Sequence, residues 1–136
     1  MALSDNRELK QFASQALVDL PVEGGKVIYK GAFIGLDGTT GYAQPLTAGD
    51  TFVGVAYAKA DNSAGSSGDI TVRAHQAIDI VHTLSGVTQA DVGALVYASA
   101  DDTLTLTATS NSRVGRVVAV EGSNLARVRI QPTFWI

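Results

Sequence analysis

Cysteine is absent from the 136-residue chain. This absence excludes disulfide frameworks, thiolate metal sites and thiol nucleophiles together, and it leaves the redox compartment undefined. Charge is also scarce, because charged residues make up 17% of the chain, against about 25% in a typical soluble domain. A surface so poor in charge favours a protein that is partly covered by a partner.

Positive charge is in deficit, with a formal net charge of −3 at pH 7. Nucleic-acid binding needs a basic surface that neutralises phosphates, so the composition argues against a nucleic-acid partner. No apolar run approaches the roughly 20 residues of a membrane span, and the first eight residues lack the apolar core of a signal peptide. We therefore expect a soluble protein that has no membrane partner and no usual secretion signal.

Alternation of polar and apolar residues with a period of two predicts β-strands in much of the chain. It is clearest over residues 103–109, where threonine alternates with leucine or alanine, and over residues 70–80. Turn sequences separate the strand-rich runs, and the last turn, at 121–124, predicts a hairpin with a four-residue loop. The further strand-rich runs are residues 26–36, 51–58, 94–98, 114–120 and 125–130.

Helical signal is weak. Residues 88–92 could form one turn capped by Thr88, and residues 5–11 could form a short helix or a loose arm. The length fits one domain that supports its own core. We predict an all-β fold, a compact small β-barrel or β-sandwich of the β-tulip kind. It would form a single domain over residues 12–136, preceded by an extended N-terminal arm over residues 1–11.

A faint internal repeat is also present. The sequence Gly-Ala-Phe-Ile at 31–34 is followed by a strand that contains Gly54, and Gly-Ala-Leu-Val at 93–96 is followed by a strand that contains Gly115. Glycine inside a strand marks a bulge, a bend or a close backbone approach. The pattern predicts two related β units around one core.

A search for catalytic groups finds little. His75 and His82 would lie on opposite faces of one continuous strand, which is unsuitable for a shared metal site. There is no Gly-x-Ser-x-Gly nucleophile elbow. The glycine-rich residues 35–41 lack the lysine of a phosphate loop, and residues 61–69 lack the glutamate of a calcium loop.

The aspartates lie mainly beside glycine or polar turn residues, where short carboxylates form local hydrogen bonds. We therefore predict that the protein is not an enzyme and uses no metal or cofactor. The aspartates weighed as possible hydrolytic pairs are Asp37, Asp50, Asp61, Asp69 and Asp79.

Both chain ends and two polar strand faces are candidate interfaces. The chain ends in three large apolar residues, which must pack on the domain's own core or on another subunit. The N-terminal arm has few groups to hold it to its own domain. The candidate interface residues are Arg7, Phe12, Arg73, His75, Arg127, Arg129, Phe134, Trp135 and Ile136.

Several strand-and-turn sequences resemble those of the capsid decoration (cement) proteins of tailed phages, a family often labelled as a domain of unknown function. The sequences that carry the resemblance are residues 27–36, 41–56, 92–99, 113–117 and 126–130. The resemblance extends over roughly residues 7–130 and contains no catalytic motif.

This resemblance implies a compact β-barrel-like fold that assembles as a homotrimer. It further implies attachment to the major capsid protein at threefold or quasi-threefold points of the outer capsid surface, with stabilisation of the expanded head. The protein would be made in the cytoplasm of the host bacterium and reside in the virion. No catalytic residue is implied.

Two other functions remain open. A carbohydrate- or receptor-binding module of a phage tail or fibre would need exposed aromatic platforms. We expect Tyr29, Phe33, Phe52 and Tyr97 in core strands, which leaves Tyr42, Tyr57 and the C-terminal aromatics as platforms. A small hydrolase is disfavoured by the motif search.

Overall fold

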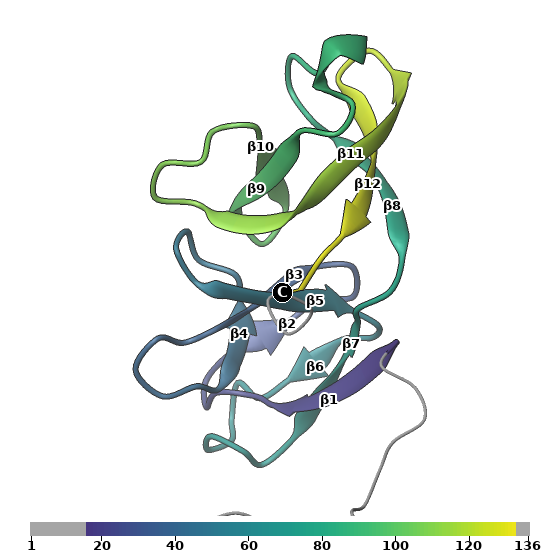
Figure 1. Ribbon diagram of the computed structural model, residues 1–136. Helices are drawn as coiled ribbons and strands as arrows, with labels where there is room; N and C mark the ends of the chain where they lie inside the picture. Colours follow the sequence, from purple (N-terminus) through teal and green to yellow (C-terminus); the bar gives the residue numbers. More distant parts are fainter. Residues whose placement is uncertain (1–15, 133–136) are drawn as a thin grey trace, which may run out of the picture.

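The computed structural model describes residues 16–132, and this part of the chain is all-β, as predicted. Two five-stranded antiparallel sheets lie one above the other in Figure 1, accompanied by a two-stranded sheet and one 3₁₀ turn. No sheet of the described residues closes into a barrel. The predicted arm at 1–11 and the C-terminal residues 133–136 lie outside the described residues.

The first β unit is the lower sheet in Figure 1, with the strand order β1-β7-β5-β3-β4. Two shorter strands between its members, β2 and β6, pair with each other and form the small sheet. The strands are β1 (Leu17–Pro21), β2 (Val27–Ile28), β3 (Phe33–Leu36), β4 (Ala43–Pro45), β5 (Thr51–Ala56), β6 (Ala60–Asp61) and β7 (Thr71–His75).

The second β unit is the upper sheet, with the strand order β10-β9-β11-β12-β8. Its 3₁₀ turn η1 (Gln89–Asp91) begins at the predicted cap, where the Asp91 carboxylate accepts hydrogen bonds from the backbone N–H and the hydroxyl of Thr88. The strands are β8 (Asp79–Thr83), β9 (Leu95–Ala100), β10 (Thr103–Thr105), β11 (Ser112–Gly122) and β12 (Leu125–Ile130).

The two units repeat one topology. Strands β1, β3, β4, β5 and β7 correspond in chain order to β8, β9, β10, β11 and β12, and this correspondence converts the first sheet order into the second. Even the isolated parallel bridges match, because Val22 pairs with Ala43 and Leu84 pairs with Leu104. Only the β2–β6 sheet has no counterpart among the described residues of the second unit.

The glycines that suggested the repeat occupy equivalent bulges. Gly54 of β5 pairs with Ile34 of β3, and Gly115 of β11 pairs with Val96 of β9; the register shifts by one residue at each position. An added Cβ at Gly54 would lie 2.6 Å from the His75 carbonyl oxygen. The bulges therefore need glycine because the next strand approaches too closely for a side chain.

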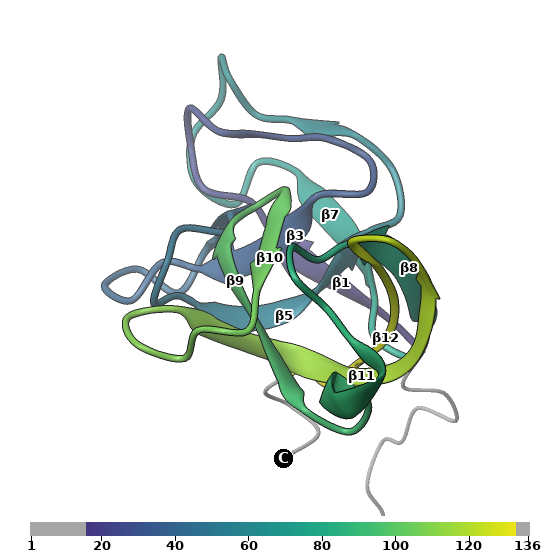
Figure 2. The ribbon, with the colours of Figure 1, turned by 90° about the horizontal axis from the view of Figure 1, so that it is seen from above.

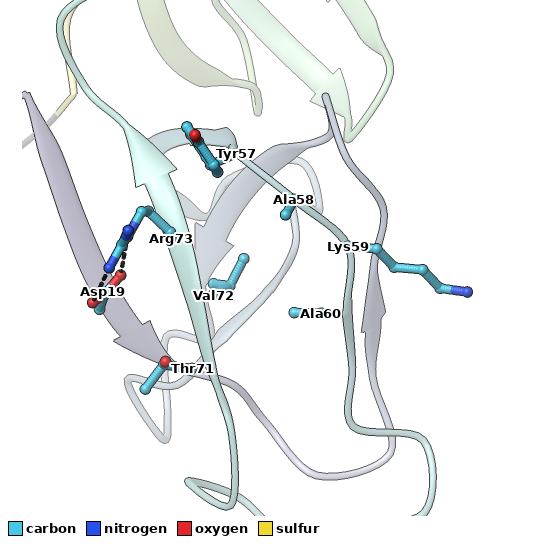
Figure 3. Close-up of a pocket in the computed structure, with 8 residues that line it drawn as sticks. All are labelled: Asp19, Tyr57, Ala58, Lys59, Ala60, Thr71, Val72 and Arg73. Carbon is cyan, nitrogen blue, oxygen red and sulfur yellow. Dashed lines mark hydrogen bonds and ion pairs between the residues drawn. The ribbon is translucent and has the colours of Figure 1, made fainter.

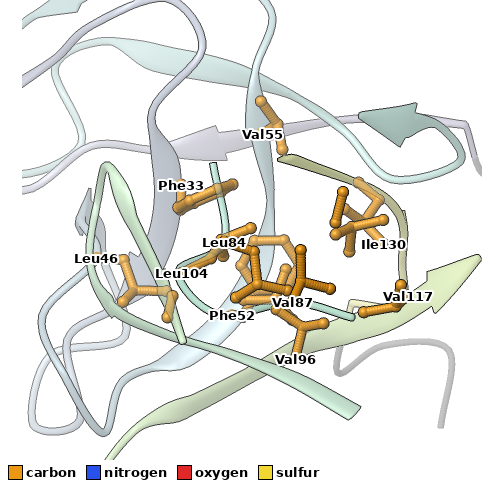
Figure 4. Packing of buried hydrophobic residues seen from close by; sticks show 14 residues of the cluster. Phe33, Leu46, Phe52, Val55, Leu84, Val87, Val96, Leu104, Val117 and Ile130 are labelled. Carbon is orange, nitrogen blue, oxygen red and sulfur yellow. The ribbon is translucent and has the colours of Figure 1, made fainter. Parts of the chain in front are cut away.

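Strands β3 and β5 are buried on both faces. Ile34 and Val53 belong to the core of the first unit, whereas Phe33 and Phe52 belong to the core of the second. Because the bulge inserts one residue into β5, Val55 faces the same way as Phe52. Figure 2 shows the second unit overlying β3 and β5, and Figure 4 shows Phe33, Phe52 and Val55 among the side chains of the second unit.

The predicted long strand over residues 70–80 is in fact two strands in different sheets, β7 and β8. The connecting segment is anchored by Gln76, which is buried and donates a 3.0 Å hydrogen bond from Nε2 to the Val53 carbonyl at the β5 bulge. His75 and His82 consequently lie in separate units rather than on opposite faces of one strand. A period of two cannot reveal such a break, since both strands happen to keep the same parity.

Two other predicted strands are shorter than expected. The run 26–36 is divided into β2 and β3 by a turn with Gly31 at φ +84°. The threonine-rich run ends as a strand at Thr105, after which the hydroxyl of that residue accepts a hydrogen bond from the Thr107 N–H. The hairpin at 121–124 is present, with Gly122 paired to Leu125 and only two residues in the loop. No helix in residues 16–132 is long and apolar enough to cross a bilayer.

We expect Gly115→Ala to lower the free energy of unfolding by about 2–3 kcal/mol, because its Cβ would overlap the Arg129 carbonyl oxygen. The matched control is Gly38→Ala in the β3–β4 loop, where a Cβ meets no atom within 4 Å. This control should change stability by no more than about 0.5 kcal/mol. Urea unfolding measures both values, and equal effects would contradict the bulge argument.

Candidate functional site

The structure places four of the nine predicted interface residues. Arg73 and His75 lie on β7 of the first unit, and Arg127 and Arg129 lie on β12 of the second. Each pair shares a strand face, but the two pairs belong to different sheets. The predictions at Arg7, Phe12, Phe134, Trp135 and Ile136 fall outside the described residues.

The two arginines of β12 form ion pairs on an exposed face. Arg129 donates from Nε and Nη2 to the two carboxylate oxygens of Asp79 on β8, at 2.8 and 3.0 Å. Arg127 contacts Glu121 at 2.9 Å. The Arg129 hydrogen bonds hold the pKa of Asp79 below its ordinary value. The Arg129 pair links β12 to β8, and the Arg127 pair links β12 to β11. Such contacts are typical of a solvent-exposed face with a structural role.

Arg73 forms the same kind of bidentate pair in the first unit. Its Nε and Nη2 donate to the Asp19 carboxylate at 2.9 and 3.1 Å, across the β1–β7 ladder. The hydrogen bond from Arg73 lowers the pKa of Asp19. Beside this pair, the His75 ring lies 5.0 Å from the ring of Tyr57, measured between centroids.

The first unit also carries two exposed tyrosines. Tyr29 is 60% exposed and Tyr57 is 48% exposed. The prediction that Tyr29 lies in a core strand is wrong, because Ile28 takes the buried position and the chain turns at Gly31. The Lys59 Nζ lies 5.3 Å from the centre of the Tyr29 ring, within cation–π range. We call Tyr29, Tyr57, Lys59, Arg73 and His75 the tyrosine patch.

A shallow depression of about 280 Å³ is lined in part by Tyr57, Lys59 and Arg73 of the tyrosine patch. Figure 3 shows small apolar side chains between β7 and the segment that leads to β6, with Tyr57 at one end and Arg73 on the β7 side. Lys59 extends away from this floor, on the side opposite Arg73. The lining residues are Asp19, Tyr57, Ala58, Lys59, Ala60, Thr71, Val72 and Arg73.

The depression exists because the sheet splits there. The β5–β7 ladder ends at the pair of Ala56 with Ala74, and a last hydrogen bond joins the Tyr57 N–H to the Arg73 carbonyl at 2.8 Å. After Tyr57 the chain diverges from the neighbouring strand β7 and forms β6, which pairs with β2 instead. Residues 71–73 of β7 therefore have a strand neighbour only on the β1 side. We call this gap the β6–β7 split.

The lysines of the described residues all flank the β2–β6 sheet. Lys26 and Lys30 bracket β2, and Lys59 precedes β6. None of the three forms an ion pair with a carboxylate of residues 16–132, whereas three arginines do. The β2–β6 sheet, which has no counterpart in the second unit, is thus flanked by an exposed tyrosine and by lysines that no direct ion pair among the described residues neutralises.

A second depression, also of about 280 Å³, lies where the two units meet. Tyr29 and Lys30 line it from the first unit, and His82, Asp101 and Asp102 line it from the second. Burial raises the pKa of Asp101, and the neighbouring Asp102 charge adds to the effect. The His82 ring lies 5.3 Å from that of the buried Phe33, which makes this histidine part of the junction between the units.

The loops weighed for phosphate or calcium have local structural roles. The Asp37 carboxylate accepts hydrogen bonds from the backbone of Thr39 and Thr40. Asn62 is buried and donates from Nδ2 to the carbonyl groups of Val22, Glu23 and Ser66. Within residues 16–132, no group of three histidine, aspartate or glutamate side chains is placed to hold a metal ion.

Comparison of the chain with protein-family models, with curated proteins and with solved structures gave no match.

The tyrosine patch was only partly visible in the sequence. Arg73 and His75 were identified from strand alternation, and Tyr57 remained as a possible aromatic platform. Tyr29 and Lys59 were missed because they lie apart in sequence and meet only through the β2–β6 pairing. The available signal was the glycine two residues after Tyr29, which interrupts the strand in which that side chain was placed.

We predict that the Asp19–Arg73 pair makes stability depend on pH in acid. The folded pKa of Asp19 lies below the unfolded value, so the pair stabilises the fold above about pH 4. That contribution is lost as the pH falls through the folded pKa. In thermal unfolding, Asp19→Asn should be less stable than the natural chain at pH 6, and the difference should shrink below about pH 4.

The control is Arg73→Gln, which removes the partner. The double variant should lose less than the sum of the two single losses, since both remove one interaction. A difference between Asp19→Asn and the natural chain that stays constant down to pH 2 would contradict the assignment.

Proposed function

We propose that the protein is a capsid decoration protein of a tailed phage. In this role it binds the outer surface of the major capsid protein lattice as a homotrimer and stabilises the head. Two lines support the proposal. The first is the resemblance of its strand and turn sequences over roughly residues 7–130. The second is the tyrosine patch, whose side chains fit a protein-binding surface.

The tyrosine patch is the observation that carries the proposal. A single exposed apolar residue is ordinary on a protein surface. Here Tyr57, 48% exposed, borders a depression floored by small apolar groups, and Lys59, which also lines the depression, lies over the ring of Tyr29, 60% exposed. Tyrosine and arginine are enriched where binding energy concentrates in protein interfaces. Tyr29 and Lys59 of the patch also adjoin the β2–β6 sheet, which is added to the repeated topology.

The mechanism of stabilisation follows from multivalent binding. A trimer that contacts several capsid subunits at once converts weak single contacts into a strong attachment. Because the trimer binds only the lattice that displays all the matching sites, it shifts the equilibrium toward that lattice. The capsid protein supplies the repeated sites, and the decoration protein supplies the cross-links.

Carbohydrate or receptor binding by a tail or fibre module is the second candidate. The exposed Tyr29 favours it, because a half-exposed aromatic ring beside polar groups is suited to stack on a sugar. Tyr57 with its neighbour Arg73 offers a similar platform. A strong hit on a glycan array, combined with the absence of shell binding, would favour this candidate over the first.

We expect the purified protein to be trimeric by light scattering and to co-sediment with expanded shells of the phage that carries its gene. Tyr57→Ala should weaken shell binding at least tenfold, since truncation of an interface tyrosine commonly costs about 2 kcal/mol. Heated shells should lose integrity at a higher temperature when the protein is bound.

The matched control is Val92→Ala, which removes an exposed apolar side chain of the second unit, 40% exposed and remote from the tyrosine patch. It should bind shells as the natural chain does. A protein that stays monomeric at high concentration and does not sediment with shells would overturn the proposal. Equal losses of shell binding in Tyr57→Ala and Val92→Ala would show that the tyrosine patch is not the capsid-binding surface.

A further inference from the structure

We propose that the β6–β7 split binds an extended segment of the partner protein, with one apolar side chain seated on the floor and a neighbouring carboxylate held by Lys59. This inference rests on the proposed function for the identity of the partner. It specifies what the partner must offer at the tyrosine patch.

The backbone of β7 supports an extended segment. Residues 71–73 pair with β1 on one side, and on the other side the ladder with β5 has already ended, so that only the Arg73 carbonyl still accepts a hydrogen bond there, from the Tyr57 N–H. A strand with one unpaired side is a template for another strand, which adds to it through main-chain hydrogen bonds. Lining residues on both sides of the depression, Thr71 to Arg73 and Ala58 to Ala60, come from separated stretches of chain. A segment of a few residues fits such a gap.

The floor supports an apolar anchor. Ala60 and Val72 are 6% and 1% exposed, and with Ala58 they form a small apolar base beside the Tyr57 ring. A volume of about 280 Å³ lies just below the usual range of small-molecule sites. It suits one or two amino-acid side chains. Burial of a leucine-sized side chain there would remove apolar surface from water on both partners.

The charges support a carboxylate next to the anchor. Arg73 is already paired with Asp19, so that pair contributes little net charge. Lys59 forms no ion pair with the described residues, and its Nζ is held over the Tyr29 ring. Because Lys59 extends away from the floor on the side opposite Arg73, a carboxylate that binds its ammonium group must lie at that outer edge of the depression, next to the residue seated on the floor. The Asp61 carboxylate accepts hydrogen bonds from both the hydroxyl and the backbone of Ser63, which lower its pKa, and the Lys59 charge adds a smaller effect without a direct ion pair.

The test uses nitrogen-15-labelled full-length protein and three synthetic pentapeptides. The first has the sequence valine-leucine-valine between two aspartates, the second has two lysines in their place, and the third keeps the aspartates around three glycines. We expect the first peptide to shift the backbone amide signals of residues 57–60 and 71–73. The second and third should bind at least about threefold more weakly, which is the loss expected from one exposed ion pair or from one lost apolar contact.

Two variants and one control locate the contacts. Ala58→Phe fills the depression at an exposed position and should abolish the shifts. Lys59→Gln should weaken the first peptide about threefold and abolish its preference over the second. Lys26→Gln makes the same change of charge at a lysine that does not line the depression, and it should leave binding unchanged. Unchanged melting temperatures would show that all three variants fold.

Four results would overturn the inference: equal binding of the acidic and basic peptides, shifts confined to other residues, stronger shifts with a thymidine oligonucleotide, or shifts on concentration of the protein alone. The last would assign the split to a second copy. Failure of the proposed function is distinguishable from these results. Peptide binding without shell binding would reject capsid decoration but keep the β6–β7 split as a binding site for an extended segment. Shell binding that survives Ala58→Phe would reject only the role of the split.

Discussion

The described structure depends on the burial of β3 and β5 on both faces. Ile34 and Val53 pack into the first β unit, and Phe33 and Phe52 pack into the second. A strand buried on both sides has no solvent face, so its two cores cannot separate without exposing large aromatic surface. Alternation along each strand supplies both faces, and the glycine bulge in β5 adds Val55 to the core of the second unit, on the same face as Phe52.

The same packing explains why the tyrosine patch lies where it does. The second β unit covers the β3–β5 face of the first, and the β2–β6 sheet packs Ile28 and Ala60 onto the other core. To form β6 there, the chain that follows β5 must separate from the neighbouring strand β7 after Tyr57. This separation opens the β6–β7 split. The polar and aromatic groups that face outward are thus a consequence of how the first core is closed.

Much of the fold could be predicted from the sequence, and the errors have local causes. Alternation located most strands, and glycine spacing located both bulges, because sterics restrict what can stand at a close backbone approach. The long strand over 70–80 was wrong because β7 and β8 keep one parity across a change of sheet. Of the candidate site, Arg73 and His75 followed from strand faces, whereas Tyr29 was misplaced because the turn at Gly31 was read as part of a strand.

The sequence by itself determined the all-β class, the duplicated units and the capped turn at Thr88, since each depends on side-chain period, backbone freedom or a local hydrogen bond. Tertiary structure alone decided which strands share a sheet, and it brought Lys59 over Tyr29 and opened the gap beside β7. Such contacts join residues distant along the chain. They are set by how the two cores are filled, and a local sequence pattern does not show which of the possible packing arrangements fills both cores.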